Sequence, residues 1–148
     1  MSQCVEWSSG VLAVDHISQL HRQCFGDSSL SRICFHQDER SNLHVMLISL
    51  PVGCSYPIHC HDDVDEWYFI LRGSLVIAEY RMDGVLEKST VLSSQEVGVH
   101  QALGILMPKG VWHSTSAGVE GAVFLEVRPG PFRKEKTRYL KQEECKQQ

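Results

Sequence analysis

A glycine, two histidines, a glutamate and a second glycine follow one another at fixed intervals in the middle of the chain. Gly53, His59, His61, Glu66 and Gly73 fit the spacing G-x5-H-x-H-x4-E-x6-G. Residues two apart on a β-strand point to the same face, so His59 and His61 can direct two imidazoles at one point. The polar run after them is long enough to turn the chain and bring Glu66 back on the neighbouring strand. The spacing predicts a metal pocket between two strands.

A third histidine follows a turn later in the chain. Residues 108–113 read Pro-Lys-Gly-Val-Trp-His, a Pro/Gly turn that leads a single histidine into another strand. Three imidazoles and one carboxylate form a mixed nitrogen and oxygen set suited to a first-row divalent ion. We expect one such ion per chain, Fe, Mn, Zn, Ni or Co. Its predicted ligands are His59, His61, Glu66 and His113.

Neighbouring residues offer alternatives to these ligands. Asp62, Asp63 and Asp65 lie in the same loop as Glu66, and any of them could supply the oxygen instead. We prefer Glu66 because it alone stands at the motif spacing. His100 could be an extra ligand or a proton shuttle, but it lies in a polar loop, from 95 to 101, that we expect at the surface.

The two motifs together resemble those of the cupins. The glycine, H-x-H, glutamate and glycine pattern matches their first motif, and Pro108, Gly110 and His113 match the P-x-G-x-x-H of the second. Two positions depart from the second motif, since Ala102 stands in place of a glycine and Ala117 in place of an asparagine. Neither position is a usual metal ligand. The resemblance implies an all-β fold, the cupin double-stranded β-helix or jelly-roll barrel.

A narrower resemblance covers most of the chain. The segments at 35–37 and 43–50, the Asp83-Gly84 turn and the ending Glu-Val-Arg-Pro-Gly-Pro-Phe at 126–132 are similar to those of WbuC-type cupins. These are small single-domain cupin metalloproteins that are often encoded beside genes for lipopolysaccharide O-antigen synthesis. The resemblance implies a metal-binding barrel that forms a homodimer, and it leaves the reaction open.

The residue pattern independently predicts a β-rich domain. Short apolar runs with period-two features alternate with Gly, Pro and Asp turns, which is typical of an antiparallel sandwich or barrel. Asp83-Gly84 between two runs predicts a tight hairpin. The predicted strands lie at 43–50, 67–71, 74–80, 85–92, 104–107 and 122–127.

A short helix is expected before the strands. Asp15 can cap it, Ile17, Leu20 and Cys24 share one face, and Gly26 can end it. After Phe132 the composition turns to Lys, Glu and Gln. We therefore divide the chain into an N-terminal helical extension (1–30), a cupin β-barrel (31–132) and a polar C-terminal tail (133–148).

Composition narrows the possible partners. A chain of 148 residues with 43% hydrophobic content suits one compact domain, and a net charge of −4 gives no broad basic field for nucleic acid. No apolar run approaches the roughly 20 residues of a membrane helix. The six cysteines include no C-x-x-C pair, and Cys60 between the two histidines is expected to be a small buried hydrophobe. We expect a cytoplasmic protein with reduced thiols and neither nucleic-acid nor membrane partners.

The ion also needs a pocket for a small-molecule ligand. Arg32, Arg72 and Arg128 are possible anchors for a carboxylate or phosphate, because a guanidinium can grip such a group with two hydrogen bonds. His36 and His44 are expected to make structural hydrogen bonds, although His44 could reach the pocket from the barrel wall. The candidate pocket residues are Tyr56, Trp67, Tyr68, Arg128 and His44.

Open coordination positions suggest chemistry at the ion. Three or four protein ligands leave room for substrate, water or oxygen on an ion that accepts up to six. The leading hypothesis is a metal-dependent small-molecule enzyme acting on a sugar-like or carboxylate substrate, of the isomerase, epimerase or dioxygenase class. The alternative is a non-catalytic metabolite- or metal-binding cupin with a sensor or accessory role. A purely structural ion is the third possibility.

Overall fold

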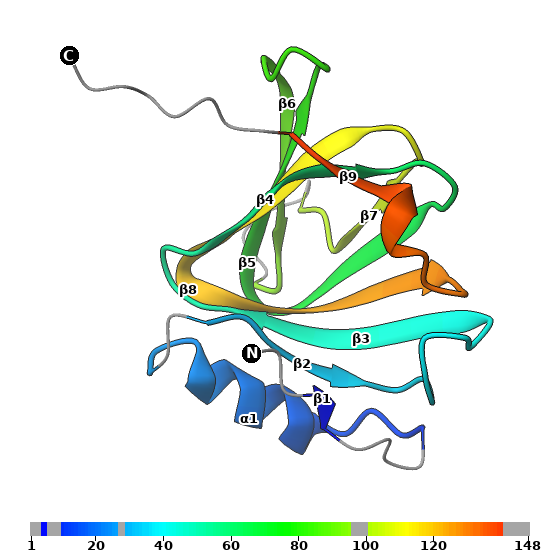
Figure 1. Ribbon diagram of the computed structural model, residues 1–148. Helices are drawn as coiled ribbons and strands as arrows, with labels where there is room; N and C mark the ends of the chain where they lie inside the picture. The colour runs from blue at the N-terminus through cyan, green and yellow to red at the C-terminus, as the bar shows by residue number, and fades with distance from the viewer. Residues whose placement is uncertain (1–3, 6–9, 27–28, 96–100, 141–148) are drawn as a thin grey trace.

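Long antiparallel strands make up most of the chain, and one α-helix packs against their outside (Figure 1). The computed structural model describes residues 4–5, 10–26, 29–95 and 101–140. The elements in chain order are β1 (Cys4–Val5), α1 (Val14–Gln23), β2 (Ser31–Cys34), β3 (Leu43–Leu50), β4 (Ser55–His61), β5 (Glu66–Tyr80), β6 (Leu86–Ser93), β7 (Gly104–Met107), β8 (Trp112–Pro129), the 3-10 helix η1 (Lys134–Lys136) and β9 (Thr137–Tyr139).

The two longest strands, β5 and β8, form the frame of the barrel. They pair antiparallel along most of their length, from Trp67 opposite Val127 to Tyr80 opposite Trp112. The second half of β8 also pairs with β3, and its first half pairs with β4. One strand therefore joins both sides of the barrel, and the path through the sheet runs β1-β2-β3-β8-β4-β9. The segments predicted at 67–71 and 74–80 are parts of the single strand β5.

The second glycine of the first motif lies where β5 and β8 bend together. Gly73 has φ 75° and Gly121 has φ 74°, a region that favours glycine. A Cβ atom at Gly73 would overlap the carbonyl oxygen of Gly121. A side chain at this position would push the two strands apart, so the motif glycine is required by backbone packing at the corner of the barrel.

Alternation along β3 divides the apolar side chains between two cores. Met46, Ile48 and Leu50 point into the barrel and join its main cluster, whereas Leu47 points outward to the cluster beneath α1. Leu47 is fully buried there with Leu20 of the helix. Burial of each such side chain stabilises the fold by about 1.5–3 kcal/mol. Apolar side chains therefore fill part of the barrel interior, and the helix covers the outer face of β3.

The start of α1 differs from the prediction. The N-cap is Ala13, and its N–H donates to Nδ1 of His16 at 3.1 Å, so the prediction of Asp15 as the cap is wrong. Asp15 lies in the first turn instead, where its negative charge interacts favourably with the helix dipole. Cys24 is the C-cap, two residues before Gly26.

No helix within the described ranges is long and apolar enough to cross a membrane.

Two further segments belong to the same sheet: the turn between β5 and β6, and the strand β9. The Asp83-Gly84 hairpin is confirmed, since Gly84 has φ 83° and its N–H donates to the carbonyl oxygen of Arg81 at 2.9 Å. Residues 137–139, assigned from sequence to the polar tail, form β9 instead and pair with β4 opposite residues 59–61. Part of that segment is therefore built into the sheet beside the histidines. Residues 141–148 of the predicted tail lie outside the described residues.

Candidate metal centre and its cavity

Four side chains from three strands meet inside the barrel. β4 carries His59 and His61, β5 begins with Glu66, and β8 carries His113 opposite His59. All four side chains are buried. One possible ligand atom from each lies within 4.8 Å of the other three. The structure thus brings together the four residues that the two sequence motifs single out.

The donor set fits a first-row divalent ion. Ligand atoms bound at about 2.1 Å stand about 3–4.2 Å from one another around such an ion. His61 Nε2 lies 3.0 Å from Glu66 Oε1, and His113 Nε2 lies 3.5 Å from Glu66 Oε2. The largest separation in the set, 4.8 Å, exceeds that range only slightly. Three imidazole nitrogens and one carboxylate could hold Fe, Mn, Co, Ni or Zn, as predicted.

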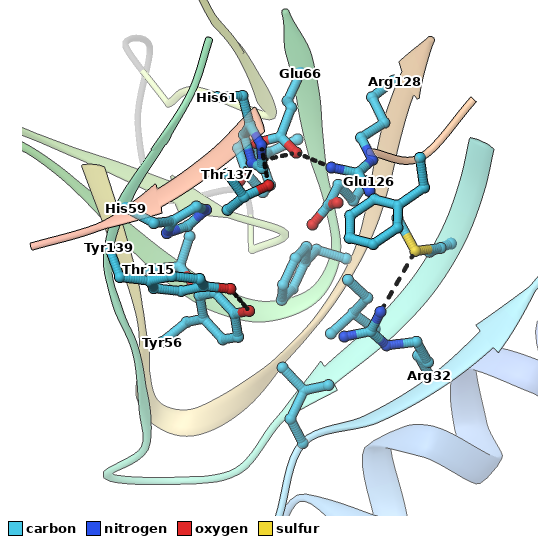
Figure 2. Close-up of a pocket in the computed structure, with 16 residues that line it drawn as sticks. Arg32, Tyr56, His59, His61, Glu66, Thr115, Glu126, Arg128, Thr137 and Tyr139 are labelled. Atoms are coloured by element: carbon cyan, nitrogen blue, oxygen red, sulfur yellow. Dashed lines mark hydrogen bonds and ion pairs between the residues drawn. The ribbon is translucent and has the colours of Figure 1, made fainter. Parts of the chain in front are cut away.

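Each imidazole is oriented by a contact to its other nitrogen. Nδ1 of His59 lies 2.8 Å from the carbonyl oxygen of Pro57, and Nδ1 of His113 lies 2.9 Å from that of Val111. Nδ1 of His61 lies 3.0 Å from Oγ1 of Thr137 on β9 (Figure 2). A carbonyl partner requires the proton on Nδ1, which leaves the Nε2 lone pair free for an ion. The rings of His59 and His113 are therefore held ready for metal binding.

Glu66 is the most heavily contacted side chain of the cluster. The hydroxyl of Tyr68 donates to its Oε2 at 2.9 Å, and Nη1 of Arg128 lies 3.4 Å from its Oε1. Burial raises the pKa of Glu66, but hydrogen bonds and charge interactions with His113 and His61 outweigh burial and hold it well below its ordinary value. Burial raises the pKa of Tyr68, so its hydroxyl stays a donor. Glu66 is therefore an ionised carboxylate aimed at the three histidines.

His59 is poised as a neutral ligand. Burial, followed by the neighbouring His113, lowers its pKa to about 4. The centroids of these two rings lie 4.3 Å apart, so two imidazolium charges would repel each other strongly. A metal ligand must be unprotonated, and His59 meets that requirement near neutral pH.

The acidic loop beside Glu66 points away from the cluster. Asp62, Asp63 and Asp65 are exposed. Oδ1 of Asp62 accepts from Nε of Arg138 at 2.7 Å, and Oδ1 of Asp65 accepts the backbone N–H of Lys109 at 2.9 Å. The alternative oxygen ligands considered from sequence are thus turned outward, and Glu66 alone joins the histidines.

A cavity of about 120 Å³ opens beside the four residues (Figure 2). The most exposed of its lining side chains are Tyr139, 52% exposed, and Phe132, 37% exposed, which mark its mouth. The hydroxyls of Tyr56 and Tyr139 lie 2.9 Å apart on one wall. The full lining comprises Leu30, Arg32, Met46, Ile48, Tyr56, His59, His61, Glu66, Tyr68, Thr115, Phe124, Glu126, Arg128, Phe132, Thr137 and Tyr139.

Three of the five candidate pocket residues line this cavity and two do not. Tyr56, Tyr68 and Arg128 line it. Trp67 lies on the outer face of β5, 43% exposed, because side chains alternate along the strand and its neighbours Glu66 and Tyr68 face inward. Its ring stacks on Phe69 with centroids 5.5 Å apart. Trp67 therefore belongs to the outer surface of the barrel.

His44 is buried beside the cavity rather than in its lining. It is 2% exposed, and its ring stacks on His36 with centroids 4.1 Å apart. The backbone of Gly130 packs against this ring closely enough that a Cβ would overlap it. Nδ1 of His36 accepts the N–H of Val45 at 3.3 Å, in line with the structural hydrogen bond expected there. Both histidines therefore support the wall behind Arg128.

The remaining candidates fall into separate environments. Cys60 is fully buried, as expected of a small hydrophobe, and burial raises the pKa of its thiol. Arg72 is exposed and does not line the cavity, whereas Arg32 does. His100 and Cys145 lie outside the described residues.

Sequence reasoning named seven of the sixteen lining residues and missed nine, among them Glu126, Thr137 and Tyr139. Glu126 stands two residues before Arg128 on β8, so strand alternation from the predicted anchor could have found it. Burial, followed by the charge of Glu66, raises the pKa of Glu126 to about 8. Thr137 and Tyr139 had no comparable signal, because the polar composition around them resembles a solvated tail.

Comparisons with known proteins agree with this architecture. A family model described as a domain of unknown function (DUF6016) matches residues 31–92. No curated protein matches the sequence. Among solved structures, a point mutant of Bacillus subtilis oxalate decarboxylase is similar with a TM-score of 0.54 and 26% identity, covering 67% of this chain and 24% of that one. The match thus spans about a quarter of the oxalate decarboxylase chain.

Two further structures share the fold over more of this chain. The protein SO0799 from Shewanella oneidensis matches with a TM-score of 0.61 and 16% identity, covering 88% of this chain and 85% of that one. CapF, solved with the inhibitor 3-isopropenyl-tropolone, matches with a TM-score of 0.62 and 17% identity, covering 77% of this chain and 32% of that one. The predicted fold class is therefore confirmed: this chain has the cupin jelly-roll fold with a short helix, and its barrel encloses a group of four residues suited to a metal ion.

Proposed function

We propose that this protein is a metal-dependent enzyme that acts on a small organic molecule bound through oxygen atoms, either sugar-like or a carboxylate. The observation that carries the proposal is a group of four convergent, buried ligand residues, three of which, His59, His61 and Glu66, line a cavity of about 120 Å³. A purely structural site would be closed by protein ligands, whereas this one borders space for a ligand. The ion would be bound by His59, His61, Glu66 and His113.

The protein side of the chemistry follows from the contacts around the cluster. A divalent ion bound there would polarise a carbonyl, hydroxyl or carboxylate oxygen of the substrate. The Nδ1 contacts of the three histidines fix their rings, and Tyr68 fixes the carboxylate of Glu66 through its hydrogen bond of 2.9 Å. The aromatic side chains of Tyr56, Tyr68 and Phe124 in the lining keep bulk water away from the substrate.

Cavity size supports a small substrate. An apolar cavity of about 150 Å³ holds one benzene molecule, so a cavity of about 120 Å³ suits a ligand of roughly five or six non-hydrogen atoms. A nucleotide-linked sugar would lie largely outside it. The likeness to oxalate decarboxylase, at 26% identity, supports a small carboxylic acid. Isomerisation, epimerisation and oxygen-dependent oxidation all remain compatible with this ligand set.

Three finer features belong to the same proposal. Membership of the WbuC-type cupins is supported by the Glu-Val-Arg-Pro-Gly-Pro-Phe segment at 126–132, which supplies three lining residues.

A homodimer is supported by exposed apolar side chains on the outer face of the barrel, including Trp67 and Phe69 at 43% and 40% exposure. Light scattering of the purified protein tests the dimer. A cytoplasmic location is supported by the free thiols of Cys24 and Cys60.

The test begins with the metal content of untagged protein purified without chelators. Elemental analysis should find about one first-row transition metal per chain in the wild type and almost none in a His59→Ala/His113→Ala variant. A matched control is His21→Ala, which removes a histidine far along the chain from the cluster and should retain the metal. Absence of metal from the wild type, with no uptake on titration, would contradict the proposal.

Turnover separates an enzyme from a binding protein. The metal-loaded wild type is incubated with a panel of small hydroxy acids, oxo acids and free sugars, and NMR follows the substrates with and without oxygen. Conversion that His61→Ala abolishes supports the enzyme. A stoichiometric ion without conversion of any compound would favour the non-catalytic sensor or accessory role.

A further inference from the structure

Three charged side chains line the cavity without belonging to the metal cluster. Arg32 comes from β2, and Glu126 and Arg128 come from the same inward face near the end of β8. Figure 2 shows the carboxyl group of Glu126 pointing into the cavity, with Arg128 beside Glu66 and Arg32 farther from the histidines. We call Arg32, Glu126 and Arg128 the arginine wall. None of these side chains is a ligand in the proposed site, so their role needs a separate explanation.

Arg128 is buried with little compensation for its charge. It is only 9% exposed, and its Nε has no hydrogen-bond partner among the described residues. Its Nη1 makes one long contact, 3.4 Å, to Glu66, and its Cζ lies 4.8 Å over the ring of Phe132. A guanidinium carries five N–H donors, and buried charges ordinarily satisfy them with carboxylates or carbonyls. Donors of Arg128 therefore remain available to a ligand.

Arg32 is similarly under-satisfied. Its Nε is buried and has no hydrogen-bond partner in the part of the chain that the structure describes. Its Nη1 lies 3.8 Å from Sδ of Met46, and a thioether sulfur is only a weak acceptor. No ion pair to Arg32 occurs within the described ranges. A second guanidinium thus faces the same cavity without an acceptor of matching strength.

Glu126 does not hold either guanidinium group. No hydrogen bond or ion pair from Glu126 to Arg32 or Arg128 occurs among the described residues. Burial, followed by the charge of Glu66, raises the pKa of its carboxyl group. The arginine wall therefore presents two guanidinium groups with unpartnered donors, which an anion rich in acceptor oxygens would complete.

We propose that the arginine wall is a subsite for the carboxylate of a small organic acid whose other oxygen function reaches the metal cluster. This inference rests on the proposed function and names its substrate class, a hydroxy or oxo acid. A planar carboxylate matches the geometry of a guanidinium fork, and its charge supplies the acceptor that Arg32 and Arg128 lack. The cavity of about 120 Å³ limits the acid to a few carbon atoms.

The test compares acids with their uncharged amides in binding to the full chain. The probes are glycolate, lactate and glycerate, paired with glycolamide, lactamide and glyceramide, and inorganic phosphate is included as a different anion. Calorimetry and thermal shift are measured on metal-loaded and metal-stripped wild type. The metal-stripped protein should bind at least one acid about tenfold or more tightly than its amide, since a hydrogen-bonded charge is lost in the amide.

Variants assign that preference to the wall. Arg32→Gln should reduce the preference for acid over amide to about twofold or less, and Arg32→Lys should restore part of it because the charge is kept. Arg72→Gln removes a charge from an exposed position of β5 outside the cavity and should change nothing. Metal content of Arg32→Gln should equal that of the wild type, because no hydrogen bond or ion pair joins Arg32 to the four ligands among the described residues.

The outcomes separate this inference from the proposed function. Equal binding of acids and amides by metal-stripped protein, or an unchanged preference in Arg32→Gln, overturns the carboxylate subsite while leaving a metal enzyme intact. Stabilisation by phosphate alone overturns it as well. A preference that depends on Arg32 in a protein that takes up no metal supports the subsite and contradicts the metal-dependent function.

Discussion

Two glutamates, Glu66 and Glu126, face the same cavity, and their surroundings shift their pKa values in opposite directions. Glu66 contacts His61, His113, Tyr68 and Arg128. Burial raises its pKa, but hydrogen bonds and charge interactions with His113 and His61 hold that pKa well below the ordinary value. Glu126 has no hydrogen bond within the described residues, and burial raises its pKa to about 8. Burial alone therefore does not decide the charge of a carboxyl group; its partners do.

The same contrast extends to the two ends of the cavity. At the metal end, every imidazole has a partner for its Nδ1, so the ligands are oriented before an ion arrives. At the arginine wall, donors of Arg32 and Arg128 lack partners in the described chain. One end is assembled by the protein itself, and the other is completed by a ligand. The predictions below test this difference.

The largest expected effect separates the two glutamates by metal affinity. Glu66→Gln replaces an ionised ligand by a neutral amide and should weaken Zn²⁺ binding at least about 100-fold. Glu126→Gln should leave the affinity within about twofold, because its carboxyl group is outside the ligand set. Competition with a chromophoric chelator measures both variants. Similar losses of affinity in the two variants would mean that both glutamates contribute to metal binding, and would contradict the separate roles assigned to them.

The next effect concerns the stability of the metal-free protein in acid. The pKa of His59 falls from about 6.5 in the unfolded chain to about 4 in the folded one, so the unfolded chain takes up the proton first as pH falls. Stability is therefore complete above about pH 6.5 and is lost between about pH 6.5 and 4. We expect a loss on the order of 2 kcal/mol, measured by urea unfolding at pH 7 and pH 4.5.

Glu66 acts in the same direction but at lower pH. Its pKa is depressed, so its contribution is present above its unfolded value of about 4.5 and is lost below it. A His59→Gln variant supplies the control, because it lacks the group that titrates in the upper window. If His59→Gln loses as much stability between pH 7 and pH 5 as the wild type, His59 is not the source of the effect.

A smaller effect tests the partner of His61. Thr137→Val removes the hydroxyl that lies 3.0 Å from Nδ1 of His61 and should weaken Zn²⁺ binding about tenfold. Thr137→Ser keeps a hydroxyl at this position and should retain most of the affinity. Chelator competition at pH 7.5 measures both. An unchanged affinity in Thr137→Val would mean that β9 contributes to the barrel only through its backbone pairing.

The sequence predicted the metal end far better than the arginine wall. Strand alternation explains why His59 and His61 could be paired from spacing alone, and the spacing of Glu66 and the turn before His113 gave the other two positions. The arginine wall depends on β3, which pairs with β2 on one side and with β8 on the other and so brings Arg32 and Arg128 to one cavity although they lie about 95 residues apart in the chain. Spacing within one motif carries no information about such a placement.

Residue type alone gave a wrong prediction for two parts of the chain, the segment 137–139 and Trp67. The Lys- and Glu-rich composition after Phe132 is typical of a solvated tail, yet pairing with β4 outweighs it and makes residues 137–139 a strand. Trp67 was placed in the pocket because aromatic residues often shape one, but its position between Glu66 and Tyr68 requires it to face outward. Tertiary pairing, which a single segment does not encode, decided the first outcome, whereas alternation along β5 decided the second.

The last prediction concerns Glu126 and tests whether its carboxylate lacks partners in solution. Its folded pKa, about 8, lies above the unfolded value of about 4.5, so its contribution to stability is complete below about pH 4.5 and is lost as pH rises through 8. Glu126→Gln keeps the shape of the side chain and removes this loss. A shift from about 4.5 to about 8 corresponds to roughly 5 kcal/mol at pH 9, so we expect the metal-free variant to melt roughly 10 °C or more above the wild type there, and within about 3 °C of it at pH 5.

Scanning calorimetry at the two pH values distinguishes the possible surroundings of Glu126. A gain confined to high pH means that an ionised Glu126 is poorly compensated, as expected if Arg32 and Arg128 are arranged for a ligand rather than for this carboxylate. A loss of stability at pH 9 would instead mean that Glu126 is paired with the arginines when ionised. The arginine wall would then be self-neutralising, and its contrast with the metal end would disappear.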